Sequence, residues 1–234
     1  MLVSPGSVFR RVSERSAYGW ALAAMLLLIT MIGWATVQTG LIDREVNRQT
    51  AKALAQLERE QSDLLSRLEL SERMEKVREA GEFNKLMLQG GAMAYAPIAL
   101  VATLMSVAAI LFAVVALAGN KPDYPTLMAV CVYSAVVDVA AAALRLGMML
   151  WYRTVEVDTS LGLLVSASGE SATIRACLSA IDPFRVWFWV LVAVGLVLTG
   201  QLSRRAAGLT CALFALLAIG ARMILIVGVA TASG

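Results

Sequence analysis

Residues 136–151 read VVDVAAAALRLGMMLW and lie in the most apolar part of the chain. They belong to an apolar run over 126–152, which is long enough to cross a bilayer, since about 20 helical residues span the hydrocarbon core. The run nevertheless carries Asp138 and, seven residues later, Arg145. An ionised side chain at the centre of a membrane helix costs about 2.5–3.5 kcal/mol on insertion scales. If this run crosses a membrane, other groups must stabilise its charges.

The composition is that of a membrane protein. Apolar residues make up 59% of the 234 residues and charged residues 16%, whereas a soluble domain is about 45–50% apolar and about 25% charged. About half of the charges fall between residues 43 and 85. This distribution predicts an all-α polytopic membrane bundle with one long polar helical insertion.

Five apolar segments reach spanning length, over residues 18–42, 93–117, 126–152, 183–202 and 206–229. Basic residues gather in the segments that would share one side of the membrane: Arg10, Arg11, Arg15, Lys121, Arg204 and Arg205. Cytoplasmic segments carry an excess of Lys and Arg. The sequence therefore predicts five transmembrane helices, with the N-terminus in the cytoplasm and the C-terminus outside it.

Residues 1–17 are predicted to form a short interfacial segment on the cytoplasmic side, before a first transmembrane helix over 18–42. Ser4 could cap a short helix with Pro5 in its first turn, and apolar side chains such as Phe9 would lie on the membrane. A cleaved signal peptide is the alternative for this part of the chain. The apolar run exceeds the roughly 7–15 residues of a signal peptide and no A-x-A site follows it, so an uncleaved span is favoured.

Residues 43–92 form the polar insertion, which is predicted to lie outside the cytoplasm. Its first part, 43–80, has no glycine or proline and is rich in helix formers. One straight helix there would extend about 55 Å, too far for the remaining residues to return. The insertion is therefore either a hairpin turning near 60–66, with a capping box from Ser66 to Glu69, or a helix lying on the membrane. Gly81 and the Gly90-Gly91 pair are predicted hinges into the second span.

A stripe of leucines marks one side of the insertion. It consists of Leu54, Leu57, Leu64, Leu65 and Leu68. Two interpretations remain open for this stripe. It is either a docking surface for another protein or part of a solvated amphipathic helix without a partner.

Four stretches of the chain resemble the bacterial members of the Yip (Ypt/Rab-interacting protein) domain family of five-span membrane proteins. They are LVSPGSVFRRVSER at 2–15, NKPDYPTLMAVCVYSA at 120–135, VDTSLGLL at 157–164 and LSAIDPFRVWFWVLVAVGL at 178–196. The last is the most specific, with Asp182, Phe184, Trp187 and Gly195 at characteristic places, and a pair like Tyr133-Ser134 also recurs in the family.

The resemblance implies a four-helix transmembrane Yip-like domain over 93–234, with an outer loop over 153–182. It also implies a multi-pass protein of the bacterial cytoplasmic (inner) membrane. Bacterial relatives look like accessory membrane proteins, and some are linked to ABC-type export systems. The long cytosolic N-terminal region of eukaryotic members has no counterpart here, so Rab-GTPase binding is not expected.

Three ionisable residues lie within the predicted spans: Asp138, Arg145 and Arg222. Asp138 and Arg145 share a helix face but are too far apart along it to meet. Arg222 lies at an intermediate depth, so we predict a contact between Asp138 of the third span and Arg222 of the fifth. Structural pairing is favoured over docking of a partner within the membrane and over an ion pathway, because no second acid lies within the spans.

Small residues are expected to let the third and fifth spans approach each other closely. They are Ala143 and Gly147 in the third span, and Gly208 and Ala212 in the fifth. Their four-residue spacing is typical of close helix contacts in membranes.

Enzyme chemistry has little support in the sequence. The chain has no histidine, which excludes histidine-ligated metals and histidine-dependent triads. Its net charge of +3 is spread out, so no nucleic-acid footprint is present. Cys131, Cys177 and Cys211 lack metal-site spacing and are predicted to be structural. No cofactor is expected.

The predicted function is therefore a non-enzymatic accessory or scaffold protein that binds another integral membrane protein within the lipid bilayer. The resemblance adds an ABC-type export system as the class of complex that it would help to assemble or regulate. The alternative is a small solute or ion transporter or channel that uses the intramembrane charges. A small-molecule substrate is not expected.

Overall fold

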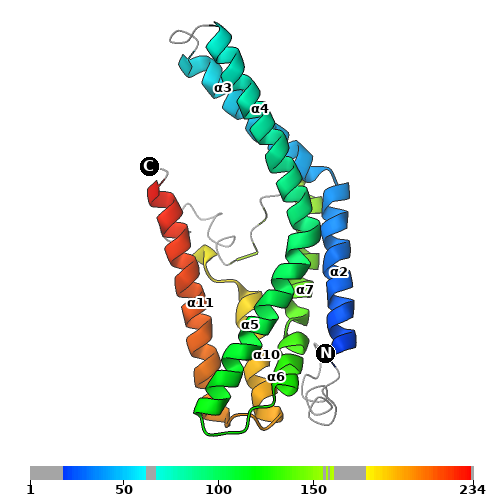
Figure 1. Ribbon diagram of the computed structural model, residues 1–234, viewed down its shortest axis with the longest axis vertical. Helices are drawn as coiled ribbons and strands as arrows, with labels where there is room; N and C mark the ends of the chain where they lie inside the picture. The colour runs from blue at the N-terminus through cyan, green and yellow to red at the C-terminus, as the bar shows by residue number, and fades with distance from the viewer. Residues whose placement is uncertain (1–17, 62–66, 155–156, 158, 161–177, 233–234) are drawn as a thin grey trace. The chain divides into compact units, whose positions relative to one another are not determined.

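The computed structural model describes residues 18–61, 67–154, 157, 159–160 and 178–232, and these residues form helices joined by short connections (Figure 1). In chain order the helices are α2 (Gly19–Gln38), α3 (Leu41–Gln61), α4 (Arg67–Gly90), the π-helix η1 (Gly91–Tyr95), α5 (Ala96–Leu117), α6 (Tyr124–Ser134), α7 (Val136–Tyr152), α10 (Pro183–Leu198) and α11 (Arg204–Ala232). The predicted all-α class is confirmed.

Within the described part of the chain, four helical segments are long and apolar enough to cross a membrane: Gly19–Gln38, Leu68–Leu117, Tyr124–Tyr152 and Arg204–Ile224. The fourth predicted span corresponds to α10, a shorter apolar helix of 16 residues. Gly200, at a φ of +71°, turns the chain just beyond the end of α10, since glycine adopts this left-handed conformation without steric cost.

The described residues fall into two compact units. The first unit contains the described residues of Met1–Leu27, Leu100–Arg145 and Asp158–Gly234. The second unit contains the described residues of Leu28–Ala99 and Leu146–Val157. The first unit holds most of the buried apolar side chains, whereas the second contains the polar insertion.

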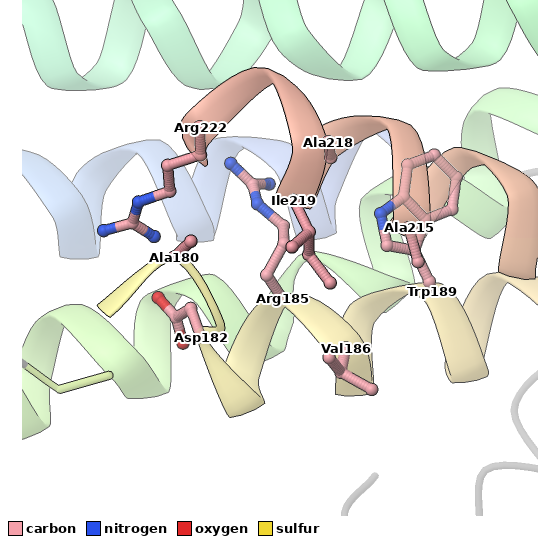
Figure 2. A pocket seen from close by; sticks show the side chains of 9 residues that line it. All are labelled: Ala180, Asp182, Arg185, Val186, Trp189, Ala215, Ala218, Ile219 and Arg222. Carbon is pink, nitrogen blue, oxygen red and sulfur yellow. The ribbon is translucent and has the colours of Figure 1, made fainter. Parts of the chain in front are cut away.

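Helix α6 is the most deeply buried helix of the first unit. Leu127, Val130 and Val132 have no exposed surface, so this helix is buried on several sides, as expected of a helix surrounded by others. Helix α10 packs on α6, and α11 packs on α10. Small side chains of α11, including Ala215, lie opposite Trp189 of α10 (Figure 2).

The outward faces of the first unit are also apolar. On α11, Leu209 is 74% exposed and Leu216 is 66% exposed. Soluble monomers rarely expose contiguous apolar surface of this kind, but lipid chains cover such faces in a bilayer. Together with the lengths of the helices, this exposure indicates that the chain is a multi-pass protein in contact with lipid.

In the second unit, α3 and α4 form an antiparallel hairpin (Figure 1). Asp43 of α3 accepts a hydrogen bond from Gln89 at 2.7 Å and pairs with Lys85 at 3.1 Å. Farther along, a Cβ added to Gly81 would lie 2.5 Å from the hydroxyl of Thr50. The hairpin is thus the arrangement adopted, rather than a single helix lying on the membrane. Its turn and the predicted cap at Ser66 fall outside the described residues.

One predicted boundary and one predicted hinge differ from the structure. Helix α2 ends at Gln38, because Gly40 has a φ of +64° and turns the chain. Leu41 and Ile42, assigned from sequence to the first span, begin α3 and are buried there. The predicted hinge at Gly81 is also wrong, since the residue lies inside α4 and packs closely against α3.

The Gly90-Gly91 pair is likewise not a hinge, because the helix is continuous from Leu68 to Leu117. Its hydrogen-bond pattern changes at η1, where the Ala96 N–H donates to the Gly91 carbonyl, five residues earlier. A π-helical turn of this kind inserts into an α-helix without ending it.

Candidate functional site

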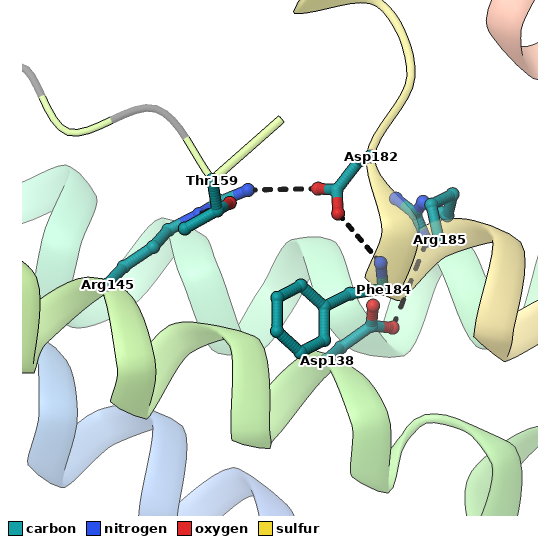
Figure 3. A network of polar contacts seen from close by, with 6 residues as sticks. All are labelled: Asp138, Arg145, Thr159, Asp182, Phe184 and Arg185. Carbon is teal, nitrogen blue, oxygen red and sulfur yellow. Dashed lines mark hydrogen bonds and ion pairs between the residues drawn. The ribbon is translucent and has the colours of Figure 1, made fainter. Parts of the chain in front are cut away.

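A network of polar side chains joins α7 to the start of α10 (Figure 3). Arg145 donates from Nη2 to Asp182 Oδ2 at 3.1 Å and from Nε to Thr159 Oγ1 at 3.0 Å. Asp138, two turns earlier on α7, lies 3.8 Å from Arg185 Nη1. The charges of the third span are therefore paired with the beginning of α10.

Asp182 has two roles in this network. Its backbone is extended and its Oδ1 accepts the Phe184 N–H at 2.9 Å, so it is the N-cap of α10, with Pro183 at the first helical position. The predicted start of the fourth span at residue 183 is confirmed. Its second carboxylate oxygen accepts from Arg145, an interaction that the local sequence did not indicate. Asp182 thus ties the start of α10 to α7.

The partner predicted for Asp138 is wrong in the structure, because Asp138 pairs with Arg185 and not with Arg222. The reason is the order in which the helices pack. Helix α10 lies against α6, and α11 packs on α10, so the start of α10 supplies the cation. Arg185 also lies 6.0 Å from the centre of the Phe188 ring, at cation–π distance.

The small residues expected at a contact between the third and fifth spans do not mark close approaches. A Cβ added to Gly147 or Gly208 would meet no atom of the described residues within 4 Å. The close approach lies elsewhere, within the second unit, where a Cβ on Gly33 of α2 would lie 2.0 Å from the Ala92 carbonyl oxygen of η1.

Arg222 lines a cavity of about 330 Å³ between α10 and α11 (Figure 2). Asp182, Arg185 and Trp189 line the same cavity. Arg222 is exposed and forms no ion pair with any residue that the structure describes. Of the three predicted intramembrane charges, two are thus paired, and the third faces a cavity.

Two residues of this site were missed from sequence. Arg185 was not considered because it lies in the first turn of α10, outside the polar insertion and beside a run of aromatic residues. Trp189 was not singled out, although tryptophans near span ends often carry a polar group that requires a partner. The signal available in the sequence was the adjacency of Arg185 to the Asp182-Pro183 cap.

The predicted leucine stripe is divided in the structure. Leu54 and Leu57 are half-buried. They follow Thr50 by four and seven residues, so they lie on the side of α3 that packs on α4. Leu68 is 72% exposed, and the remaining two leucines, at 64 and 65, lie outside the described residues.

Cys131 and Cys211 are buried and unbonded, as expected for structural cysteines, and Cys177 lies outside the described part of the chain. Over the residues that the structure describes, no three side chains of the His, Cys, Asp and Glu types gather closely enough to hold a metal ion.

The apolar helices, their exposed outward faces and the paired charges define a multi-pass helical membrane protein. More specifically, the chain belongs to the Yip1 family, because the Yip1 domain matches residues 1–226. This match covers nearly the whole sequence and confirms the resemblance seen in its motifs. No curated protein and no solved structure shows a significant match to the chain.

Proposed function

We propose that the chain is a non-enzymatic accessory or scaffold protein that binds another integral membrane protein through the α3–α4 hairpin. The bacterial cytoplasmic membrane is the proposed location, and an ABC-type export complex is the partner class that the motif resemblance suggests. The observation that carries this proposal is an apolar face on α4 that α3 leaves uncovered.

That face lies near the end of the hairpin that joins the π-helix. Phe83, Leu86 and Met87 are 61%, 66% and 58% exposed. Their spacing of three and four residues places them on one side of the helix. Gly81 and Lys85, by contrast, contact α3, so the apolar face points away from the hairpin partner. A helix of a second protein would cover these side chains.

The hairpin also has little core of its own. The buried side chains of α3 are Leu41, Ile42 and Val46, all in its first two turns, and no side chain of α4 over 68–90 is fully buried. Paired helices of this length in water gain most of their stability from tertiary packing. A docked partner would add the buried surface that the two helices do not supply to each other.

The experiment is purification of the tagged full chain in mild detergent, followed by identification of stoichiometric partners. The double variant Phe83→Gln and Leu86→Gln should lose the partner, since each buried apolar side chain contributes about 1.5–3 kcal/mol, which corresponds to at least a 100-fold weaker complex. The variant Ala55→Gln, at an exposed position of α3, is the matched control and should retain it.

Two results would contradict the proposal. One is a chain that purifies alone from membranes under every mild condition and crosslinks only to lipid from position 86. The other is solute or ion flux by the purified chain alone after reconstitution, which would support the transporter alternative.

The membrane topology is part of the proposal. Five crossings place the N-terminus in the cytoplasm, the C-terminus outside it and the hairpin on the outer side. The 16 residues of α10 extend about 24 Å, less than the bilayer core of about 30 Å. Local thinning of the bilayer accommodates such a helix at modest cost, and the basic pair Arg204-Arg205 supports an inner location for the turn that follows α10.

A further inference from the structure

We infer that the cavity between α10 and α11 binds one anionic phospholipid, whose phosphate lies between Arg185 and Arg222 and whose acyl chain passes Trp189. The chemistry recognised is a phosphate oxyanion attached to an apolar body. This inference concerns a ligand site in the first unit and does not depend on the hairpin or on the partner proposed for it.

The first observation is the charge of the site. Three arginines, at positions 145, 185 and 222, stand beside two aspartates, Asp138 and Asp182, which gives a net charge of +1 among the described residues. Asp182 pairs with Arg145 and Asp138 pairs with Arg185. No described acidic side chain pairs with Arg222. Figure 2 shows Arg185 and Arg222 coming from the two facing helices at the same end of the cavity. Two guanidinium groups in this arrangement are suited to a phosphate.

The second observation is depth. Arg222 lies 18 residues after Arg204 along α11, or about 27 Å at 1.5 Å per residue, which is close to the thickness of the hydrocarbon core. Arg185 is in the first turn of α10, which runs back from the same end. With the basic turn before α11 at one membrane surface, Arg222 lies near the other surface. Arg185 lies about 20 Å from the end of α10 at Leu198, and its long side chain extends toward the same surface.

The third observation is an unused hydrogen-bond donor inside the cavity wall. The Trp189 Nε1 atom is buried and has no hydrogen-bond partner among the residues that the structure describes. Its ring stacks on Phe214 at 5.7 Å and presents the nitrogen on the side toward the arginines (Figure 2). A buried N–H group without an acceptor is costly. In a phospholipid, the ester carbonyl lies below the phosphate and would accept from this indole.

The fourth observation is an apolar cavity of about 220 Å³ that shares Trp189 and Ala218 with the first one. Its other lining residues are Val107, Ile110, Leu111, Phe214 and Leu217, all apolar. A charged end, a neutral donor and an apolar continuation thus follow one another in the order of phosphate, ester and acyl chain. The first cavity is at the small end of the range for ligand sites, so it holds a headgroup and not a whole lipid.

The experiment is native mass spectrometry of the full chain, released from detergent containing phosphatidylglycerol or phosphatidylcholine with the same acyl chains. One phosphatidylglycerol should stay bound under conditions that remove phosphatidylcholine. Arg222→Gln should lower the retained fraction about ten-fold, because a hydrogen-bonded charge is lost. Arg222→Lys should retain most of it, and Trp189→Phe, which removes the N–H donor and keeps an aromatic ring, should lower it about five-fold.

The matched control is Arg204→Gln, which removes the same charge from the other end of α11. Equal retention in the Arg222→Gln and Arg204→Gln variants would overturn the inference, as would equal retention of the two lipids by the unmodified chain. Displacement of phosphatidylglycerol by millimolar inorganic phosphate would also overturn the lipid assignment and identify a free-oxyanion site. Gel filtration of each variant separates loss of the lipid from loss of the fold.

Discussion

The interaction between Asp182 and Arg145 offers the sharpest test of how the first unit is held together. Asp182 is 12% exposed and serves both as the N-cap of α10 and as the acceptor of a charged hydrogen bond. Asn caps a helix about as well as Asp does. The variant Asp182→Asn therefore removes the charge and keeps the cap, whereas Asp182→Ala removes both.

The two contributions can be estimated separately. Loss of a helix cap costs about 1 kcal/mol. A hydrogen bond between charged groups contributes about 1.5–3 kcal/mol, but Arg145 is 42% exposed, so solvent screening reduces this to about 1–1.5 kcal/mol. We expect Asp182→Asn to lower the free energy of unfolding by about 1–1.5 kcal/mol and Asp182→Ala to lower it by about 2–2.5 kcal/mol.

The assay is reversible unfolding of the purified chain in mixed micelles, combined in a double-mutant cycle with Arg145→Gln. The cycle should give a coupling energy of about 1 kcal/mol, because the two side chains are in direct contact. If Asp182→Asn is as stable as the unmodified chain and the coupling energy is zero within error, the ion pair does not stabilise the bundle and the reasoning fails.

Three further predictions concern other parts of the chain. Asp138→Asn should lower stability in the same assay by about 0.5–1 kcal/mol, because its partner is nearly half exposed; no loss would mean that the pair is incidental. Gly33→Ala should reduce the amount of folded protein, since overpacking costs about 1–3 kcal/mol or more, whereas Gly19→Ala, in open space, should not; equal yields would contradict the close approach of α2 to η1. Lys76→Cys, in a Cys177→Ser background, should react with an impermeant maleimide applied outside the cell. Reaction only after the cytoplasm is opened would reverse the proposed topology.

Features that depend on short stretches of chain were predictable. The apolar lengths indicated most of the membrane helices, and the apolar run over 183–202 indicated where α10 begins. The end of α10 was placed four residues too late, at 202 instead of Leu198, because a hydropathy pattern does not show where a glycine adopts a positive φ. The same limit explains the error at the end of α2, where Gly40 turns the chain two residues before the predicted end of the span.

The candidate site was predictable only in part. Asp138, Arg145 and Arg222 were identified because charges in apolar runs are conspicuous. Their partners were not, since Asp138 and Arg185 are far apart in sequence and meet only through the packing of α10 on α6, the helix that directly precedes α7. Trp189 became part of the site for a similar reason, because the absence of an acceptor for its N–H among the described residues can be recognised only once its neighbours are known.

Hydropathy and capping are properties of neighbouring residues, so the amino-acid sequence alone determined the membrane class, the helical insertion and the start of α10. Which charges neutralise one another depends on which helices are neighbours in the bundle. Apolar helices of similar length can be arranged around one another in many ways. Only the tertiary structure decided that α10 supplies the partners of α7, leaving Arg222 to face the cavity between α10 and α11.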